Sequence, residues 1–312
     1  MSGHLKNPMM HSAPPSLPRS MLFVSGEKVE RFAKAMAAGA DLVCIDLEDA
    51  VHPARKQQAR TDVLGWLKAH RPASGGAGPR VALRINGVRT ADGLRDTLAL
   101  IDSGVELDWL LVPKVENPAD LQCLDAWAGA SFSASAALLE TALGIERAAA
   151  IAAAGGRLGA LMLGGADLAV DLGAEFGWDG LRSARGRLVN AARAFGLQAW
   201  DVPHIDLARP DDLAAETRRV LALGFGCKTA IHPQQIAAIH AAFVPTPAES
   251  AWAEALIQAL PADAATGAFI FQGRMVDAPV LRKARRIVEL AADRPQPPTP
   301  GATHGSSREE DR

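Results

Sequence analysis

Acidic and basic side chains follow several short apolar runs of this 312-residue sequence. The stretch "LVCIDLEDAVHP", Leu42 to Pro53, begins like a buried strand and then brings three carboxylates close together, Asp46, Glu48 and Asp49. Other apolar runs end in Arg84, Glu140, Asp167 and Asp201. If these runs are strands whose carboxyl ends meet, Asp46, Glu48, Glu140, Asp167 and Asp201 share one cleft, where like charges repel unless a cation is present. The sequence therefore predicts a cation site.

The ligand types favour a hard divalent cation. Carboxylates, without Cys or clustered His, favour Mg²⁺, which takes only one or two protein carboxylates and keeps several waters; Mn²⁺ is a possible substitute. Open positions on such a metal suit a substrate that chelates through a carboxylate and a neighbouring hydroxyl or carbonyl. Arg84 adds a fixed cationic fork for developing enolate or carboxylate charge. This combination indicates aldol or Claisen chemistry on a keto or hydroxy acid.

The elements that must position these groups alternate between short apolar runs and Ala-rich amphipathic segments, the pattern of alternating strands and helices. Eight strands are predicted, at 21–25, 42–46, 80–85, 109–113, 135–140, 159–164, 197–201 and 227–231. Helical periodicity covers 27–38, 54–68, 91–101 and 211–223, with Asp211 as a candidate N-cap. The turn after the first strand, "VSGEKVE", is not GxGxxG, so the fold expected is α/β, a (β/α)8 TIM barrel, in place of a doubly wound sheet.

Composition divides the chain into four segments. Residues 1–18 are rich in Pro, Ser and Met and residues 293–312 are polar and rich in Pro and Gly, so both are predicted to be disordered. Residues 19–238 are expected to form the barrel. Residues 239–292 remain as a C-terminal helical extension whose role needs a separate explanation.

Charge and composition exclude several classes of partner. A net charge of -2 without a long Lys/Arg block argues against nucleic acid. Apolar stretches are too short for a membrane helix, and the N-terminus lacks the apolar core of a secretory signal. Cys44, Cys123 and Cys227 are widely spaced and odd in number, which argues against disulfides or zinc and favours the cytoplasm.

The sequence resembles the CitE-like branch of the HpcH/HpaI aldolase, citrate lyase beta subunit and malyl-CoA lyase family. The matching motifs run in order from Arg19 to Ala292: "RSMLFVSG", "KAMAAGADLVCIDLEDAVHPARKQQAR", "LRINGVRT", "LLVPKVENPADL", "LLETALGIERAAAIA", "LGGADLAVDLG", "KTAIHPQQI" and "FQGRMVDAPVLRKARRIVELA".

The resemblance implies roles for individual residues. Glu140 of "LLETALG" and Asp167 of "GGADLA" would be the direct Mg²⁺ ligands, and Arg84 would bind the substrate and stabilise a thioester enolate. Asp46, Glu48 and Asp49 would lie behind them and hold metal-bound water and neighbouring basic residues. Asp277 of "GRMVDAP" would be an acid/base that a neighbouring subunit delivers over the barrel mouth, in an oligomer that is a trimer or a multiple of one.

Other positions concern the CoA substrate and the pocket. By resemblance, Arg19, Lys28 and Lys34 are the candidates for binding the CoA phosphates. Two positions depart from the family pattern: Ser25 stands where relatives usually have Pro, and Val202 of "QAWDVPHIDL" where they often have Gly. The Ser25 change is expected to loosen a turn, and Val202 to add bulk beside Asp201 and alter the pocket.

The function expected is cleavage or formation of a 3-hydroxyacyl-CoA with a distal carboxylate, of malyl-, citramalyl- or citryl-CoA type, into a 2-oxo acid and an acyl-CoA. Three alternatives stay open: a thioesterase for malyl-CoA-type compounds, a CoA-independent metal-dependent aldolase, and a catalytically silent scaffold subunit. The sequence does not select the acyl group, or CoA over an acyl-carrier protein.

Overall fold

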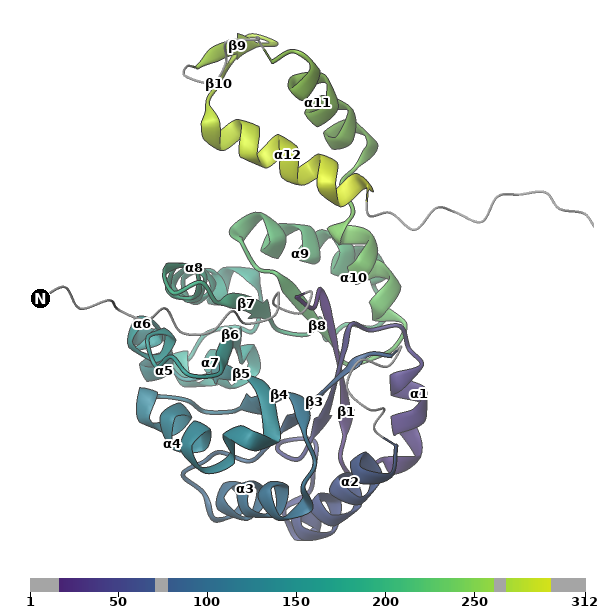
Figure 1. The fold of residues 1–312 in the computed structure, drawn as a ribbon, viewed down its shortest axis with the longest axis vertical. Helices are drawn as coiled ribbons and strands as arrows, with labels where there is room; N and C mark the ends of the chain where they lie inside the picture. Colours follow the sequence, from purple (N-terminus) through teal and green to yellow (C-terminus); the bar gives the residue numbers. More distant parts are fainter. Residues whose placement is uncertain (1–16, 71–77, 261–267, 293–312) are drawn as a thin grey trace, which may run out of the picture. The chain divides into compact units, whose positions relative to one another are not determined.

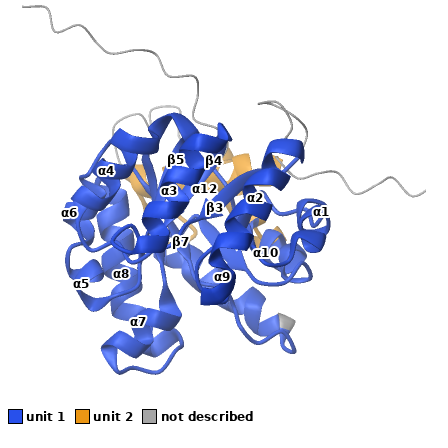
Figure 2. Cartoon of the chain, turned by 90° about the horizontal axis from the view of Figure 1, so that it is seen from below, with its two compact units in different colours: residues 1–243 blue, residues 244–312 orange. Residues whose placement is uncertain are grey.

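The computed structural model describes residues 17–70, 78–260 and 268–292. The expectations of disorder for 1–18 and 293–312 fall almost entirely outside these residues. The chain divides into two compact units, residues 1–243 and 244–312, coloured separately in Figure 2. The boundary expected at residue 238 falls inside helix α10, which runs from Gln235 to Phe243.

The first unit is a closed parallel barrel of eight strands in sequence order, with β8 returning to β1 (Figure 1). This confirms the TIM barrel expected from the sequence. The strands are β1 Ser20–Ser25, β2 Leu42–Asp46, β3 Arg80–Arg84, β4 Leu107–Val112, β5 Phe132–Leu139, β6 Leu158–Leu163, β7 Gln198–Asp201 and β8 Cys227–Ala230. Each overlaps one of the eight predicted runs.

Helices follow the strands and cover the outside of the barrel (Figure 1). They are α1 Phe32–Met36, α2 Lys56–His70, α3 Ala91–Ser103, α4 Pro118–Ala128, α5 Ala142–Glu146, α6 Ala148–Ala152, α7 Gly165–Leu172, α8 Trp178–Ala194, α9 Pro210–Leu223 and α10 Gln235–Phe243, with 3-10 turns η1 Val29–Arg31, η2 Pro53–Arg55 and η3 Gly129–Ser131. Helix α3 shows how local sequence sets these bounds. The Thr90 side chain accepts a hydrogen bond from Gly93 N at its start, and Gly104 ends it with a φ of 66°.

The core has two layers, because alternate residues of each strand point to opposite faces. Inward-facing side chains, among them Met21, Leu42, Cys44, Trp109 and Trp200, fill the barrel, and the two indoles lie with ring centroids 4.7 Å apart. Outward-facing side chains pack against the helices in a second, larger cluster. Both Cys44 and Cys227 are buried in strands, as expected.

The second unit has its own small core. Helix α11 (Pro247–Gln258) and helix α12 (Ala278–Ala292) pack with a hairpin of β9 (Phe269–Phe271) and β10 (Arg274–Val276) around Ala253, Leu256, Val276, Ala284 and Ile287. A capping box at Thr246 and Glu249 begins α11. The extension is therefore more than helices, because a two-stranded hairpin precedes Asp277.

Two details correct the sequence interpretation. Asp211 does not cap α9: the residue before the helix is Arg209, Pro210 takes the first position, and Asp211 lies in the first turn. Asp201 does not join the carboxylates in the barrel cleft. It follows the inward-facing Trp200 and therefore points outward, where it is fully buried.

Asp201 lies in a buried network of ion pairs between the barrel and its helices. Its carboxylate accepts hydrogen bonds from Arg185 Nε at 2.9 Å and from Lys228 Nζ at 2.7 Å. Lys228 also contacts Glu216 of α9, and His204 Nδ1 lies 2.7 Å from the same Glu216 carboxylate. Burial opposes the charge of Asp201, but Lys228 and Arg185 hold the pKa of its carboxyl below the usual range.

The substitution Lys228→Met should lower the free energy of unfolding by about 3 to 5 kcal/mol, because it leaves the buried Asp201 with only part of its compensating charge. Urea denaturation measures this loss. Arg209→Met, which removes an exposed pair with Asp206, is the matched control and should leave the denaturation midpoint unchanged. An equally small effect of Lys228→Met would contradict a structural role for the network.

Candidate active site

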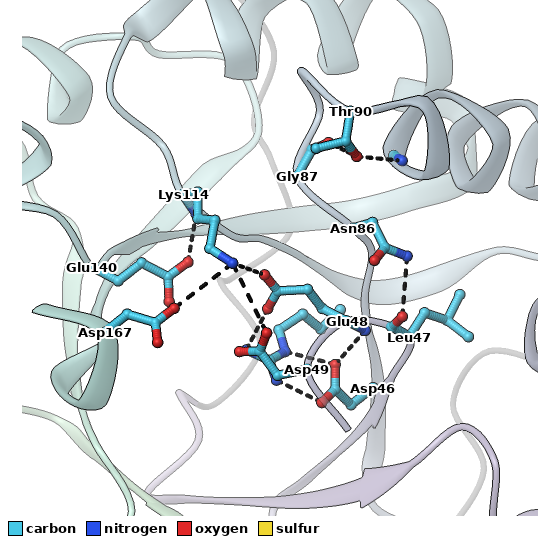
Figure 3. A network of polar contacts seen from close by, with 12 residues as sticks. Asp46, Leu47, Glu48, Asp49, Asn86, Gly87, Thr90, Lys114, Glu140 and Asp167 are labelled. Atoms are coloured by element: carbon cyan, nitrogen blue, oxygen red, sulfur yellow. Dashed lines mark hydrogen bonds and ion pairs between the residues drawn. The ribbon is translucent and has the colours of Figure 1, made fainter. Parts of the chain in front are cut away.

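The carboxyl ends of the strands surround a cavity of about 410 Å³ at the barrel mouth. Its charged lining consists of Asp46, Asp49, Arg84, Glu140 and Asp167. These residues come from β2 and the loop after it, from β3, from just after β5 and from α7. The barrel thus brings together groups far apart in the sequence, as Figure 3 shows for Asp46, Asp49, Glu140 and Asp167. The predicted cleft is present, but neither Asp201 nor Glu48 is in its lining; Glu48 instead pairs with Arg84 and Lys114.

Arg84 is the central cation of this mouth. Its Nε and one terminal nitrogen donate to the two carboxylate oxygens of Asp46 at 2.7 and 2.6 Å. Its other terminal nitrogen lies 2.8 Å from Glu48 Oε2 and 3.6 Å from Asp49. Burial opposes its charge, but Asp46 and then Glu48 hold the pKa of the guanidinium above its usual range. Arg84 is therefore a permanent cation held in a fixed orientation.

Lys114, in the loop after β4, is the second cation. Its Nζ lies 2.7 Å from Glu48 Oε1, 3.9 Å from Asp49 and 3.7 Å from Asp167 (Figure 3). Lys114 therefore pairs with the acidic cluster after β2. Its backbone has a φ of 54°, a left-handed conformation uncommon outside Gly, and its N–H donates to Glu140 Oε1 at 2.7 Å. Lys114 thus contacts both the acidic cluster after β2 and the carboxylates of Glu140 and Asp167.

The Glu140 carboxyl in the cavity has a strongly raised pKa. Its carboxyl is buried, and burial together with the nearby charges of Glu48 and Asp167 raises its pKa to about 8, although the Lys114 N–H and Arg84 act in the other direction. Burial also raises the pKa of Glu48, against the effect of Arg84 and Lys114. The two cations are thus too few for the carboxylates present, and a further cation would relieve the excess negative charge.

The cavity residues fit a hard divalent cation. Glu140 and Asp167 both line the cavity and offer oxygen donors, and Mg²⁺ needs no more than one or two protein carboxylates. In the described part of the chain no group of three or more His, Cys, Asp or Glu forms a fuller ligand cluster. Gly164 keeps the space beside Glu140 open, since a Cβ there would lie 2.6 Å from Glu140 Oε2. Glu140 and Asp167 are the two residues that could hold the metal.

A layer of polar contacts that the sequence did not reveal supports the cluster after β2. Lys56 Nζ donates to the carbonyls of Leu47 and Glu48 at 2.9 and 2.7 Å. Asn86 Nδ2 donates to Leu47 O at 3.1 Å (Figure 3). Asn86 is fixed by Asp96, whose other oxygen accepts from Arg60 at 2.5 Å. The spacing of Lys56 and Arg60, four residues apart on α2, was the available signal, because such residues share one helix face.

Ser25 also contributes to the loops of the mouth. Its hydroxyl donates to Ala50 O at 2.6 Å and accepts from Glu27 N at 3.2 Å. The hydroxyl thus joins the loop after β1 to the loop after β2, and the expectation that Ser25 loosens the turn stays a prediction.

The structure does not bring Arg19 to the mouth. Arg19 precedes β1, at the amino ends of the strands, and its guanidinium contacts both carboxylate oxygens of Asp41 at 3.2 Å. Lys28 and Lys34 are exposed, in the loop after β1 and on α1.

Asp277 lies in the second unit, directly before α12. Its carboxylate accepts a hydrogen bond from Val280 N at 3.2 Å, so the side chain caps the helix. A chemical role for Asp277 must therefore be separated from this capping role in any experiment.

Comparisons with known proteins agree with this geometry. The family model described as HpcH/HpaI aldolase/citrate lyase matches residues 19–233. The citrate lyase subunit beta-like protein of Mycobacterium tuberculosis is 36% identical, over 87% of this chain and 95% of that protein. The mitochondrial citramalyl-CoA lyase of Rattus norvegicus is 32% identical, over 88% of this chain and 86% of that protein.

A solved structure shows the same likeness. The CitE protein of Mycobacterium tuberculosis, in complex with magnesium, acetoacetate and coenzyme A, is 35% identical and superposes with a TM-score of 0.77. The match covers 89% of this chain and 99% of that one.

The fold and the cavity define a TIM-barrel enzyme with an acidic, arginine-centred mouth. The chain belongs to the HpcH/HpaI aldolase/citrate lyase family, a family of carbon–carbon lyases, and within it to the CitE-like group. The family resemblance expected from the sequence motifs is confirmed.

The raised pKa of Glu140 predicts a pH dependence of stability in protein kept free of divalent metal with EDTA. The unfolded carboxyl loses its proton near its ordinary value of 4.5, whereas the folded one keeps it up to about 8. The folded state then binds more protons, so the free energy of unfolding should fall as pH rises between these values. The Gln side chain of Glu140→Gln cannot titrate, so the free energy of unfolding of this variant should fall less steeply between pH 5 and 8, as measured by urea denaturation. Identical slopes for the two proteins would contradict the shift.

Proposed function

We propose that this protein is a Mg²⁺-dependent lyase that cleaves or forms a 3-hydroxyacyl-CoA with a distal carboxylate, of malyl-, citramalyl- or citryl-CoA type. The products of cleavage would be a 2-oxo acid and an acyl-CoA. The observation that carries the proposal is the meeting of Glu140 and Asp167 with Arg84 in one cavity. Relatives named as citramalyl-CoA lyase and L-malyl-CoA/beta-methylmalyl-CoA lyase, and a relative solved with magnesium and coenzyme A, support it.

Glu140 and Asp167 would hold the metal. When bound, it supplies a Lewis acid for the carboxylate and hydroxyl of the substrate and lowers the pKa of that hydroxyl. Glu140 would bind the metal as a carboxylate, so metal binding would release the proton from its carboxyl. Mn²⁺ is a possible substitute.

Arg84 would stabilise the charge that develops during cleavage. The hydroxyl would pass its proton to water, the carbonyl of the 2-oxo acid forms, the carbon–carbon bond breaks, and its electron pair passes into the thioester enolate. Asp46 and Glu48 hold the guanidinium in place before the reaction, so little reorganisation is needed as the enolate charge appears. The enolate is then protonated at carbon.

Asp277 is proposed as the acid that delivers this proton, and as the base that removes it in the condensation direction. We propose further that it comes from a neighbouring subunit of a homo-oligomer, a trimer or a multiple of one. Its place in a compact unit of its own, residues 244–312, agrees with such a role.

Lys28 and Lys34 are favoured for the CoA phosphates because both are exposed, whereas the Arg19 guanidinium is engaged by Asp41.

We propose the cytoplasm as the compartment. No helix in the described part of the chain is long and apolar enough to cross a membrane.

The purified protein with Mg²⁺ should release an acyl-CoA and a 2-oxo acid from at least one thioester of the malyl-, methylmalyl-, citramalyl- and citryl-CoA series, measured by product chromatography. Glu140→Gln should lose Mg²⁺ binding and turnover, because one of two metal ligands is neutralised. Glu146→Gln, at an exposed carboxylate on α5, is the control and should retain both. Release of free CoA alone would indicate a thioesterase, cleavage without CoA a free aldolase, and no turnover a scaffold subunit.

Asp277→Asn should bind substrate normally but lose exchange of the acetyl-CoA methyl protons with deuterated water, measured by NMR. Asn is as good a helix cap as Asp, so the thermal stability should not change. Asp277→Ala removes the cap as well and shows how much of any effect is structural. Normal exchange in Asp277→Asn would disprove the acid/base role.

Mixing two inactive variants tests whether the site is shared between subunits. If Asp277 reaches a neighbour's barrel, co-refolded Asp277→Asn and Arg84→Gln chains should recover turnover, because some mouths then combine an intact Arg84 with an intact Asp277. Each variant refolded alone is the control. Failure of the mixture to recover activity would place both residues in the same chain's site.

A further inference from the structure

The mouth cavity has two chemically different sides. The charged groups Asp46, Asp49, Arg84, Glu140 and Asp167 lie at the ends of β2, β3 and β5 and on α7. The side formed by the segment before α8 and by the loops after β7 and β8 is lined by Phe176, Val202, Pro203, Ile205 and Ile231. A substrate in this cavity therefore contacts charge on one side and hydrocarbon on the other.

The charged side offers no spare cation for a second substrate carboxylate. Among the described residues that line the cavity, Arg84 is the one cation, beside four carboxylates. Its nitrogens already face Asp46, Glu48 and Asp49. The nearby Lys114 ammonium is shared between Glu48, Asp49 and Asp167. The proposed metal would hold one substrate carboxylate, and a second would meet a surplus of negative charge.

Among the residues that the structure describes, the apolar side offers no cation either. His204, in the loop after β7, contacts Glu216 and is not among the lining residues. Arg209 in the same loop pairs with Asp206 and Asp212. A carboxylate turned toward Val202, which is 2% exposed, would lose water without gaining a partner, which costs free energy.

The apolar side is also closely packed at its base. Val202 is 2% exposed, and a Cβ added at the neighbouring Gly165 would lie 2.7 Å from Val202 Cγ1 and 3.1 Å from Phe176 Cε2. The Val202 side chain, which the sequence analysis expected to add bulk to the pocket, thus packs against α7 and forms part of the cavity wall. This leaves room for a hydrogen or a small alkyl substituent rather than a long one.

From these observations we infer that the 2-oxo acid half of the substrate carries one carboxylate and a small uncharged substituent, as glyoxylate and pyruvate do. An oxaloacetate half, with two carboxylates, is disfavoured. The inference rests on the proposed lyase function and narrows its substrate class to malyl- and citramalyl-type thioesters, with Val202 and Ile205 as specificity-determining residues.

Turnover of a substrate panel tests the inference. With Mg²⁺ present, kcat/KM for malyl- or citramalyl-CoA should exceed that for citryl-CoA by at least about tenfold, because a charge left unpaired in the cavity is unfavourable. A kcat/KM for citryl-CoA equal to or above the better of the two would overturn the inference.

Binding of the free 2-oxo acids tests it without turnover. Pyruvate with Mg²⁺ should raise the thermal unfolding temperature at concentrations at least about tenfold below those that freshly prepared oxaloacetate requires. If no thioester is cleaved, the proposed function fails, and this measurement still decides the inference by itself. Equal or tighter binding of oxaloacetate would overturn it.

A gain-of-function variant provides a sharper test. Ile205→Arg places a cation on the apolar side at a residue that is 62% exposed, so folding should tolerate it, and the ratio of oxaloacetate to pyruvate affinity should rise about tenfold or more. Leu207→Arg, in the same loop and 52% exposed but outside the cavity lining, is the charge-matched control and should leave the ratio unchanged. An equal change in both variants, or none in Ile205→Arg, would contradict the assignment of this side.

Discussion

The mouth of this barrel depends on a single guanidinium set among carboxylates. Arg84 faces Asp46, Glu48 and Asp49, and without it those three acids would repel one another at the end of buried strands. Burying these charged groups costs desolvation free energy, because they leave water. The bidentate hydrogen bonds between Arg84 and Asp46 offset this cost, together with the backbone amides of Glu48 and Ala50, which also donate to Asp46. The charges at the mouth then favour the binding of a further cation, since the negative charge near Glu140 is not fully compensated by Arg84 and Lys114.

The elements of the fold were predictable because strand and helix periodicities differ. The buried runs at 42–46 and 227–231 are short, apolar and bounded by turn or helix signals, and both became strands with their expected cysteines inside. Helix ends were less predictable. At α9, Pro210 takes the first helical position and moves Asp211 into the first turn, because Pro fits there without an amide hydrogen.

The site was predictable at the level of strand ends and not at the level of side-chain direction. Asp201 ends a strand and Glu140 directly follows one, yet Trp200 occupies the barrel interior, so Asp201 faces Lys228 and Arg185. Only the alternation of inward and outward residues separates the two cases, and its phase requires knowledge of which side is packed. The contacts of Lys56 and Asn86 with the Leu47 carbonyl were equally hidden, because backbone acceptors leave no mark on the sequence.

The separation of the cavity into a charged side and an apolar side has a consequence for how this scaffold can change. The charged groups form one connected network, so a substitution in any of them disturbs several others at once. Phe176, Ile205 and Ile231 belong to separate connecting segments and have apolar side chains outside the hydrogen-bond and ion-pair network, so each can be exchanged alone. Mutational tolerance is thus concentrated on one half of the mouth. A lineage can acquire new substrates there while its bond-breaking apparatus stays under purifying selection.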